Sequence, residues 1–225
     1  MIFENKPEIG WGIFTIPDLA RILNLKYHKV QKVLNEYWDT RFAAQLGSKY
    51  SWTDGKSRAV TFHTLVEFYI YYRFKEAGAN TKDILKAHQE LSERFDTPFP
   101  FASSQIINKV GTFGKKIVIS LDPEHIMDLN NTRQLKLHFI KSFITKLDFD
   151  GNDLASRFWP LGKEKSVVVD PHHQFGQPTI AGSNILTATV FNMYLAKEPV
   201  PFIASTFGLN DKSVADAIDF CKNAA

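Results

Sequence analysis

The feature that most constrains the fold is a pair of short helical repeats in residues 14–39, FTIPDLARILNLKYHKVQKVLNEYWD. Thr15 is followed three residues later by Asp18, which is typical of a capping box at a helix N-terminus, and Pro17 fits the first helical turn. Asn24 interrupts the apolar periodicity, and asparagine tolerates the left-handed backbone conformation that a tight turn requires. The sequence therefore predicts two helices joined by a short turn.

The second of these helices has two unlike faces. Apolar residues recur at helical spacing and predict a buried stripe, formed by Val30, Val33, Leu34 and Tyr37. The opposite face is polar and mostly basic, and comprises Lys26, His28, Lys29, Gln31 and Lys32. Side chains of these types contact phosphates and base edges when a helix enters the major groove, so these five are candidate DNA-binding residues. The alternative is an ordinary solvated face on a small helical hairpin.

A β-hairpin is predicted directly afterwards, in residues 47–62, GSKYSWTDGKSRAVTF. Two alternating runs flank Asp54-Gly55, a dipeptide that strongly favours a hairpin turn. The basic residues of this segment complete the candidate DNA-binding set: Lys49, Lys56 and Arg58. A basic hairpin after a helix-turn-helix predicts a winged-helix arrangement, in which the wing reaches the DNA backbone or the minor groove.

Two more helices are predicted before residue 96. Residues 63–77 are apolar nearly all round, which indicates burial on two sides. Asn80 is expected to cap the next helix, whose apolar stripe consists of Ile84, Leu85, His88, Leu91 and Phe95. Taken together, residues 13–95 resemble the MerR-type winged-helix head. Gln31-Lys32-Val33 stands where that family has an arginine followed by aromatic residues, so the groove contacts are expected to differ.

Residues 96–165 are expected to form a separate α+β connecting segment. Thr97 to Phe101, TPFPF, contains two prolines and predicts a linker or an edge element. A β-hairpin is predicted from QIINKV (105–110) and KKIVISL (115–121), which flank Gly111–Gly114, and a helix is predicted from about Thr132 to Leu147. Neither GTFGKK nor DFDGND has the spacing of a phosphate-binding or calcium-binding loop, so both are interpreted as turns.

The segment 167–185, VVVDPHHQFGQPTIAGSNI, places a carboxylate and two histidines before a glycine-rich turn. Asp170, His172 and His173 are the residues that a metal-dependent or catalytic role would use. Adjacent histidines point to opposite sides of an extended chain, and no further Cys or His stands at ligand spacing. We therefore expect no metal, no cofactor and no enzymatic activity, and we expect Asp170 to accept backbone N–H bonds at a turn.

The same segment resembles the opening of the domain-of-unknown-function 433 family. The residues that carry the resemblance are Asp170-Pro171, Gly176, Pro178, Ile180, Gly182 and Ile185. The resemblance spans residues 165–223 and implies a β-strand, a helix over 187–196 and a homeodomain-like helix-turn-helix around Gly208. Asn210 or Asp211 is expected to cap the last helix. The expected core of this part includes Phe202, Phe207 and Phe220.

Net charge differs between the two ends of the chain. Residues 1–75 carry 11 Lys and Arg against 7 Asp and Glu (net +4), whereas residues 166–225 carry 3 against 5 (net −2). Because DNA affinity comes largely from neutralised phosphates, the acidic tail is expected to bind protein or to dimerise. The candidate partner-binding residues are Lys197, Glu198, Pro199, Val200 and Phe220.

The expected fold is mainly α with small β-hairpins, in three consecutive parts: a winged helix-turn-helix head (1–95), an α+β connecting segment (96–165) and the C-terminal domain (166–225). A winged head joined to such a tail resembles the VapB-type antitoxins. The resemblance implies a protein that binds operator DNA, neutralises a PIN-like ribonuclease toxin and represses its own operon. The alternative is a plain transcriptional regulator whose tail only dimerises. A homodimer or a higher oligomer is expected in either case, through residues 63–77 or through the tail.

A cytoplasmic location is expected. The N-terminal sequence MIFENKPEIG lacks the basic and then apolar layout of a signal peptide. No apolar run approaches the roughly 18 residues that cross a bilayer. The single cysteine, Cys221, excludes an internal disulfide framework and fits a reducing compartment.

Overall fold

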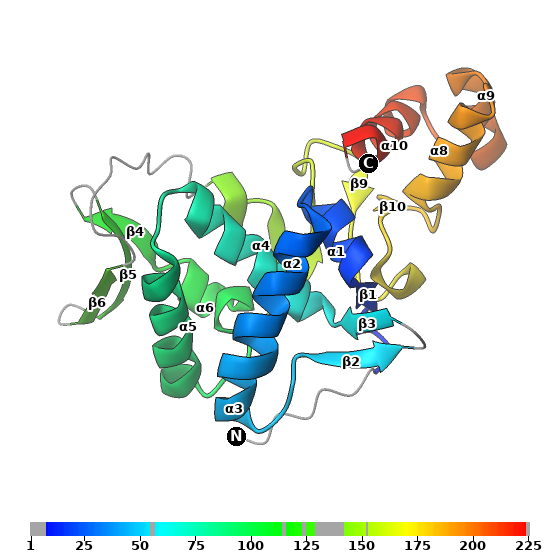
Figure 1. Ribbon diagram of the computed structural model, residues 1–225. Helices are drawn as coiled ribbons and strands as arrows, with labels where there is room; N and C mark the ends of the chain where they lie inside the picture. The colour runs from blue at the N-terminus through cyan, green and yellow to red at the C-terminus, as the bar shows by residue number, and fades with distance from the viewer. Residues whose placement is uncertain are drawn as a thin grey trace. The chain divides into compact units, whose positions relative to one another are not determined.

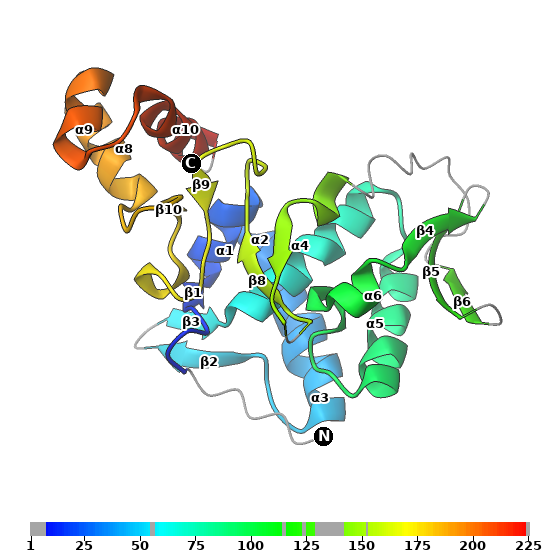
Figure 2. The ribbon, with the colours of Figure 1, turned by 180° about the vertical axis from the view of Figure 1, so that it is seen from behind.

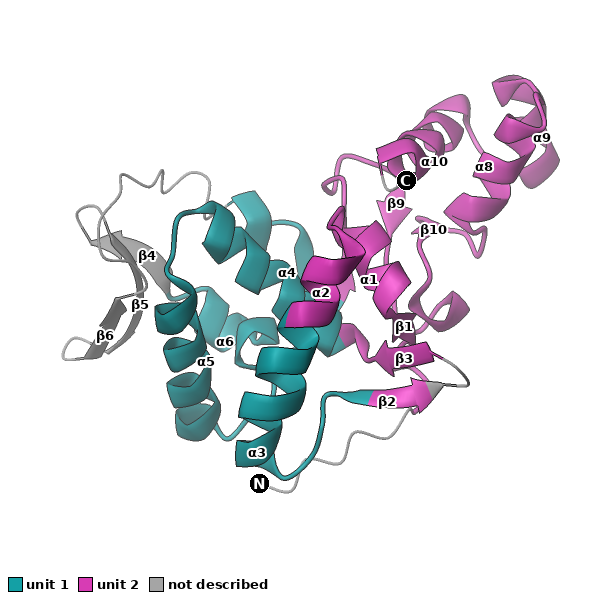
Figure 3. Cartoon of the chain, in the orientation of Figure 1, with its two compact units in different colours: residues 1–5, 33–51, 63–156 teal, residues 6–32, 52–62, 157–225 magenta. Residues whose placement is uncertain are grey.

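The computed structural model describes residues 8–54, 57–113, 116–122, 125–128, 142–151 and 153–223. The chain is mainly helical with small antiparallel sheets, as predicted (Figure 1). It divides into two compact units (Figure 3). Unit 1 contains the described residues of 33–51 and 63–156, and unit 2 contains those of 8–32, 52–62 and 157–223. This division does not follow the three consecutive segments predicted from the sequence, because the front of the chain and its tail belong to one unit.

The front of unit 2 consists of β1 (Phe14–Thr15), α1 (Ile16–Leu23) and α2 (Tyr27–Val33). The predicted capping box is confirmed: the Thr15 side chain accepts from the Asp18 N–H, and the Asp18 carboxylate accepts from the Thr15 N–H. The predicted turn is confirmed as well, since Asn24 ends α1 with φ 52° and ψ 53°, in the left-handed region.

The predicted hairpin is confirmed as β2 (Ser51–Asp54) and β3 (Ser57–Val60), with its turn residues, Gly55 and Lys56, outside the described part of the chain. The sequence did not predict that β1 pairs with β3 and makes this a three-stranded sheet in the order β1-β3-β2. Phe14 is opposite Val60 in an antiparallel register. The sheet therefore connects the start of α1 to the hairpin.

The tail of unit 2 begins at the end of β8 (Ala155–Phe158) and continues through β9 (Val167–Val168), β10 (Thr179–Ile180), α8 (Thr187–Leu195), α9 (Val200–Phe207) and α10 (Asp211–Asn223). β9 and β10 pair antiparallel, and Phe158 bridges Val169. In both views of the ribbon, the three tail helices pack together beyond the β9–β10 pair (Figures 1 and 2). Their shared core consists of Ile180, Val190, Ile203, Ala204, Val214, Ala217 and Ile218.

The predicted helix-turn-helix of the tail has the expected local signals. Gly208 ends α9 at φ 64°, and the Asn210 side chain caps α10 by accepting from the Ser213 N–H at 2.8 Å. One predicted core residue is wrong: Phe202 is 51% exposed. The buried positions of α9 are the two that follow it, Ile203 and Ala204, so Phe202 lies on the outer side of the helix.

Unit 1 is built from η1 (Leu34–Phe42), α3 (Ala43–Leu46), α4 (Phe62–Glu76), α5 (Thr81–Phe95), η2 (Pro100–Ala102) and α6 (Ser104–Ile107). The predicted burial of residues 63–77 is confirmed, because α4 is buried on nearly every side. The same burial argues against this helix as a dimer interface. Trp38 lies in the core against Phe42, Phe68 and Tyr71.

The predicted linker Thr97–Phe101 is wrong. Phe99 and Phe101 are buried, and Glu67 Oε1 accepts from the Phe101 N–H at 2.7 Å and the Ala102 N–H at 3.2 Å. Pro100 is the first residue of η2, and the aromatic side chains on either side of it belong to the core of unit 1.

The predicted hairpin of the middle segment is confirmed as β4 (Val110–Phe113) and β5 (Lys116–Asp122), to which β6 (His125–Asp128) adds a third strand. Residues 105–107 are helical instead of extended, because the Asp153 carboxylate caps α6 by accepting from the Gln105 N–H at 2.7 Å. Most of the predicted helix from Thr132 lies outside the described residues. Its expected end, Leu147, instead begins β7 (Leu147–Phe149), which pairs with β8.

Candidate functional site

The basic face of α2 is the first candidate site. Lys26, His28, Lys29 and Lys32 are exposed and Gln31 is half-buried, as the sequence predicts. On the other side of the helix Val30 and Val33 are buried. Within the described part of the chain, the side chains of Lys26, His28 and Lys29 take part in no hydrogen bond or ion pair. These three side chains are therefore available to an external partner.

One residue of this surface was not predicted. Tyr27, the first residue of α2, is 47% exposed and lies between two exposed basic residues, Lys26 and His28. Its spacing of three residues to Val30 makes it look like the start of the buried stripe, so periodicity alone assigns it to the wrong face. An exposed aromatic ring beside basic side chains is suited to contact a sugar or a base.

The basic residues of the hairpin are distributed differently from the prediction. Arg58, on β3, is half-buried and belongs to unit 2 together with α2. Lys49 is exposed but belongs to unit 1, and Lys56 lies outside the described residues. Of the predicted hairpin cations, Arg58 is thus the one that the structure places in the same unit as α2.

The predicted docking edge of the tail is mostly at the surface. Lys197 and Pro199 are exposed, and Glu198 and Val200 are half-buried, in the turn between α8 and α9. Phe220 is a correction: it is 3% exposed, because its position on α10 faces inward, so its side chain cannot dock a partner. Two apolar residues that were not predicted to be exposed flank the turn, Leu195 at 57% and Phe202 at 51%.

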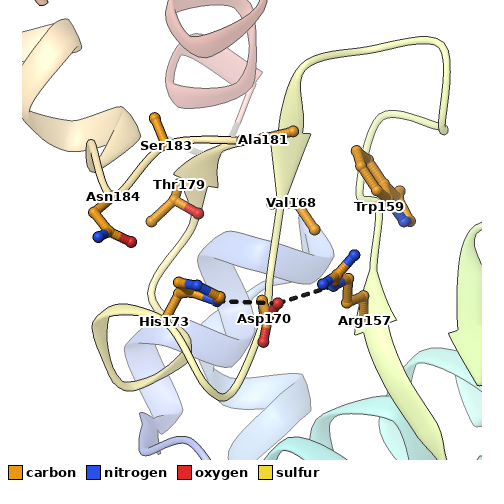
Figure 4. Close-up of a pocket in the computed structure, with 10 residues that line it drawn as sticks. Arg157, Trp159, Val168, Asp170, His173, Thr179, Ala181, Ser183 and Asn184 are labelled. Carbon is orange, nitrogen blue, oxygen red and sulfur yellow. Dashed lines mark hydrogen bonds and ion pairs between the residues drawn. The ribbon is translucent and has the colours of Figure 1, made fainter. Parts of the chain in front are cut away.

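A pocket of about 420 Å³ lies in the tail, over the β9–β10 pair (Figure 4). Its walls come from the segments 157–159, 168–173 and 179–184. Asp170 lies at its base between two partners: Arg157 Nε is 2.9 Å and His173 Nδ1 is 3.1 Å from Asp170 Oδ2. The predicted turn bond is confirmed, since Asp170 Oδ1 accepts from the His172 N–H at 2.9 Å.

The charge of Asp170 is stabilised by these partners. Burial alone would raise the pKa of Asp170, but hydrogen bonds from the His172 N–H, Arg157 and His173 outweigh it and hold the pKa below its ordinary value. The two histidines diverge, as expected: His173 contacts Asp170, whereas the His172 ring lies against Gly10, where a Cβ would be 2.8 Å from Nδ1. Across the described residues, no group of three His, Cys, Asp or Glu side chains could hold a metal ion.

Comparison with known proteins supports the fold. No family model matches the chain, and no curated protein matches it. The chain is similar to the crystal structure of Rv2018 from Mycobacterium tuberculosis, with a TM-score of 0.69 and 15% sequence identity. The match covers 96% of this chain and 100% of that one. At this identity the likeness establishes a shared fold. No helix among the described residues is long and apolar enough to cross a membrane.

Proposed function

We propose that this chain is a DNA-binding antitoxin that represses its own operon through a winged helix-turn-helix and binds a PIN-like ribonuclease toxin through its tail. The observation that carries the DNA-binding part is the exposed basic face of α2, opposite a buried apolar face. On this face the side chains of Lys26, His28 and Lys29 have no partner among the described residues. A helix held in this way can present lysines to phosphates and polar groups to base edges without rearrangement.

The surface of the tail supports a protein partner. Neither α8 nor α9 contains a charged residue. Leu195 at the end of α8 and Phe202 in α9 lie on either side of the turn between the helices, and both are exposed. An uncharged surface with exposed apolar side chains suits a protein interface and does not suit a polyanion. The toxin is the partner implied by the resemblance of the chain to VapB-type antitoxins.

The same observation also favours a second candidate function. An uncharged helix pair with exposed Leu195 and Phe202 also suits a second copy of this chain, because like charges would not oppose the contact. In that case the protein is a plain winged-helix regulator whose tail dimerises. Pull-down of the tagged protein from its native cell, followed by mass spectrometry, separates the two. A PIN-like protein in near-stoichiometric amount supports the antitoxin; promoter DNA with no such protein supports the plain regulator.

DNA binding is tested by its dependence on salt. Lys29→Ala removes one exposed cation from α2, and we expect it to weaken binding to the promoter of its own operon and to reduce the slope of log affinity against log salt by about 1. Lys86→Ala removes another exposed cation, from α5, and serves as the control, which should leave the slope unchanged. Equal slopes for both variants and the wild type, measured by fluorescence anisotropy, would show that α2 does not contact DNA.

A further inference from the structure

The pocket over the β9–β10 pair has the size of a small-molecule site. Its volume of about 420 Å³ falls within the range of roughly 300–1,000 Å³ that is common for such sites. It is concave, and Gly182 on its rim leaves open space where a Cβ would stand. The proposed DNA-binding and toxin-binding surfaces do not use it.

The pocket contains side-chain nitrogens without a partner among the described residues. Asp170 is the only carboxylate among the lining residues, and its oxygens already accept from Arg157, His173 and the His172 N–H. Arg157 uses only its Nε in this contact, and His173 uses only its Nδ1. No interaction within the described residues involves the two terminal nitrogens of Arg157 or the Nε2 of His173, and both side chains are about half exposed.

Asp170 therefore acts as an anchor and not as the ligand-binding group. It is almost fully buried, and it fixes the orientation of the Arg157 and His173 side chains from the base of the pocket. Figure 4 shows Arg157 and His173 on opposite sides of Asp170, and both side chains line the pocket. A guanidinium held in this way favours a carboxylate or a phosphate, because it can donate two parallel hydrogen bonds.

The other walls add an apolar component. Trp159 stands beside Arg157, and Val168 lies between the two sides of the pocket (Figure 4). On the His173 side, Thr179 and Asn184 supply neutral polar groups. We propose that this pocket binds a small anion, a carboxylate or phosphate group attached to a flat apolar body, with Arg157 and His173 holding the anion and Trp159 contacting the body.

The test uses three small probes that share a phenyl ring: benzoate, phenyl phosphate and the neutral benzamide, which has the shape of benzoate without its charge. Each is titrated into the 15N-labelled full-length protein while NMR follows the indole N–H of Trp159, assigned with Trp159→Phe. We expect saturable shifts with at least one anion and weaker binding of benzamide. The tighter of the two anions identifies the group that the pocket prefers.

Variants locate the binding site. Arg157→Gln should weaken binding of the preferred anion by at least about tenfold, because it removes the charged fork, and His173→Gln should weaken it less. Lys222→Gln, which removes a cation from α10 outside the pocket, is the control for non-specific attraction and should bind as the wild type does. Circular dichroism confirms that each variant is folded; Arg157 is half exposed, so its loss should not unfold the tail.

Three results would overturn the proposal. One is the absence of a saturable shift with either anion. Another is equal affinity for benzamide, which would mean that the pocket recognises the ring and not the charge. The third is unchanged affinity in a folded Arg157→Gln protein, or an equal loss in Lys222→Gln, because either would place the binding elsewhere.

Discussion

At the scale of single residues, Asp216 links two parts of the tail through hydrogen bonds. This carboxylate is 2% exposed and accepts from Lys165 Nζ at 2.8 Å, from the Ser166 N–H at 3.0 Å and from Lys212 Nζ at 3.3 Å. Burial alone would raise the pKa of Asp216, but these three donors outweigh it and keep the pKa below its ordinary value. Asp216 thereby joins the turn before β9 to α10.

We predict that Asp216→Asn lowers the free energy of unfolding of the tail by about 2 kcal/mol at pH 7, because charged hydrogen bonds become neutral ones. Since the folded pKa is depressed, this stabilisation is complete above about pH 4 and is lost as the pH falls through the folded pKa. Urea denaturation at pH 7 and pH 3 should therefore show a difference that shrinks in acid. Asp219→Asn, on the exposed side of α10, should show little difference at either pH.

A second buried carboxylate, Glu67, acts in unit 1. Its Oε1 accepts from two backbone N–H groups, those of Phe101 and Ala102, and its Oε2 lies 2.8 Å from His88 Nε2. The last contact does not have hydrogen-bond geometry. Both side chains are almost fully buried, and the His88 ring stacks on Phe42 at 4.0 Å between centroids.

Glu67→Ala should destabilise unit 1 by about 3–5 kcal/mol, because it leaves buried N–H groups without an acceptor. Glu67→Gln should cost less, since an amide oxygen still accepts from the Phe101 N–H. Thermal unfolding of the two variants measures the difference. If Ala and Gln were equally damaging, the backbone bonds would contribute little and the contact with His88 would be the important one.

At the scale of elements, the turn between α1 and α2 depends on one backbone conformation. Asn24 has φ 52°, and β-branched residues are strongly disfavoured there. We predict that Asn24→Val destabilises the α1–α2 pair by about 1–2 kcal/mol, whereas Asn24→Gly is tolerated. Hydrogen exchange of the α1 and α2 amides, compared with that of α10, measures the local effect. Equal protection in the two variants would contradict the prediction.

Elements with strong local signals could be predicted from the sequence. The cap at Thr15, the turn at Asn24, the cap at Asn80 and the cap at Asn210 are all where the sequence predicts them, because each depends on residues within three positions. Elements set by distant partners could not be predicted. β1 exists because β3 pairs with it, and α6 is capped by Asp153 from some fifty residues away.

Of the candidate sites, too, one could be predicted from the sequence and the other could not. The basic face of α2 follows from helical periodicity, so its residues could be named from the sequence. The pocket needs Arg157 and Trp159 beside Asp170, which requires the end of β8 to pair with the residue after β9. The periodicity of the sequence does not indicate that Phe158 pairs with Val169. The exposure of Phe202 and Leu195 was missed for a related reason, since apolar residues are assigned to a core by default.

At the scale of the molecule, the segment 170–178 connects the tail to the front of unit 2. One side of it carries the pocket residues Asp170 and His173. The other side holds the front of the chain: the Ile13 N–H donates to the Phe175 carbonyl at 2.8 Å, and Arg21 Nη2 donates to Gln177 Oε1 at 2.9 Å. Residues more than 150 positions apart are thus packed as one unit, and the proposed DNA-binding helix pair is supported by the tail.

Gly176 is the residue of segment 170–178 that lies against the Phe14 ring at the front of unit 2. It has φ +85°, and a Cβ there would lie 2.4 Å from Phe14 Cζ. Gly208, the control, has φ +64° and open space around its Cβ position. Gly208→Ala should therefore cost only the backbone strain, about 1–2 kcal/mol, whereas Gly176→Ala should add about 1–3 kcal/mol by displacing Phe14.

Because Phe14 belongs to the strand that leads into α1, the displacement should also reach the proposed DNA-binding surface. We predict that Gly176→Ala weakens promoter binding severalfold at a temperature where it is still folded, and that Gly208→Ala does not. Thermal unfolding and fluorescence anisotropy on the same samples measure both effects. Equal loss of stability with unchanged DNA binding in the two variants would mean that the front of the chain holds its conformation without the tail, and that the two ends of unit 2 function independently.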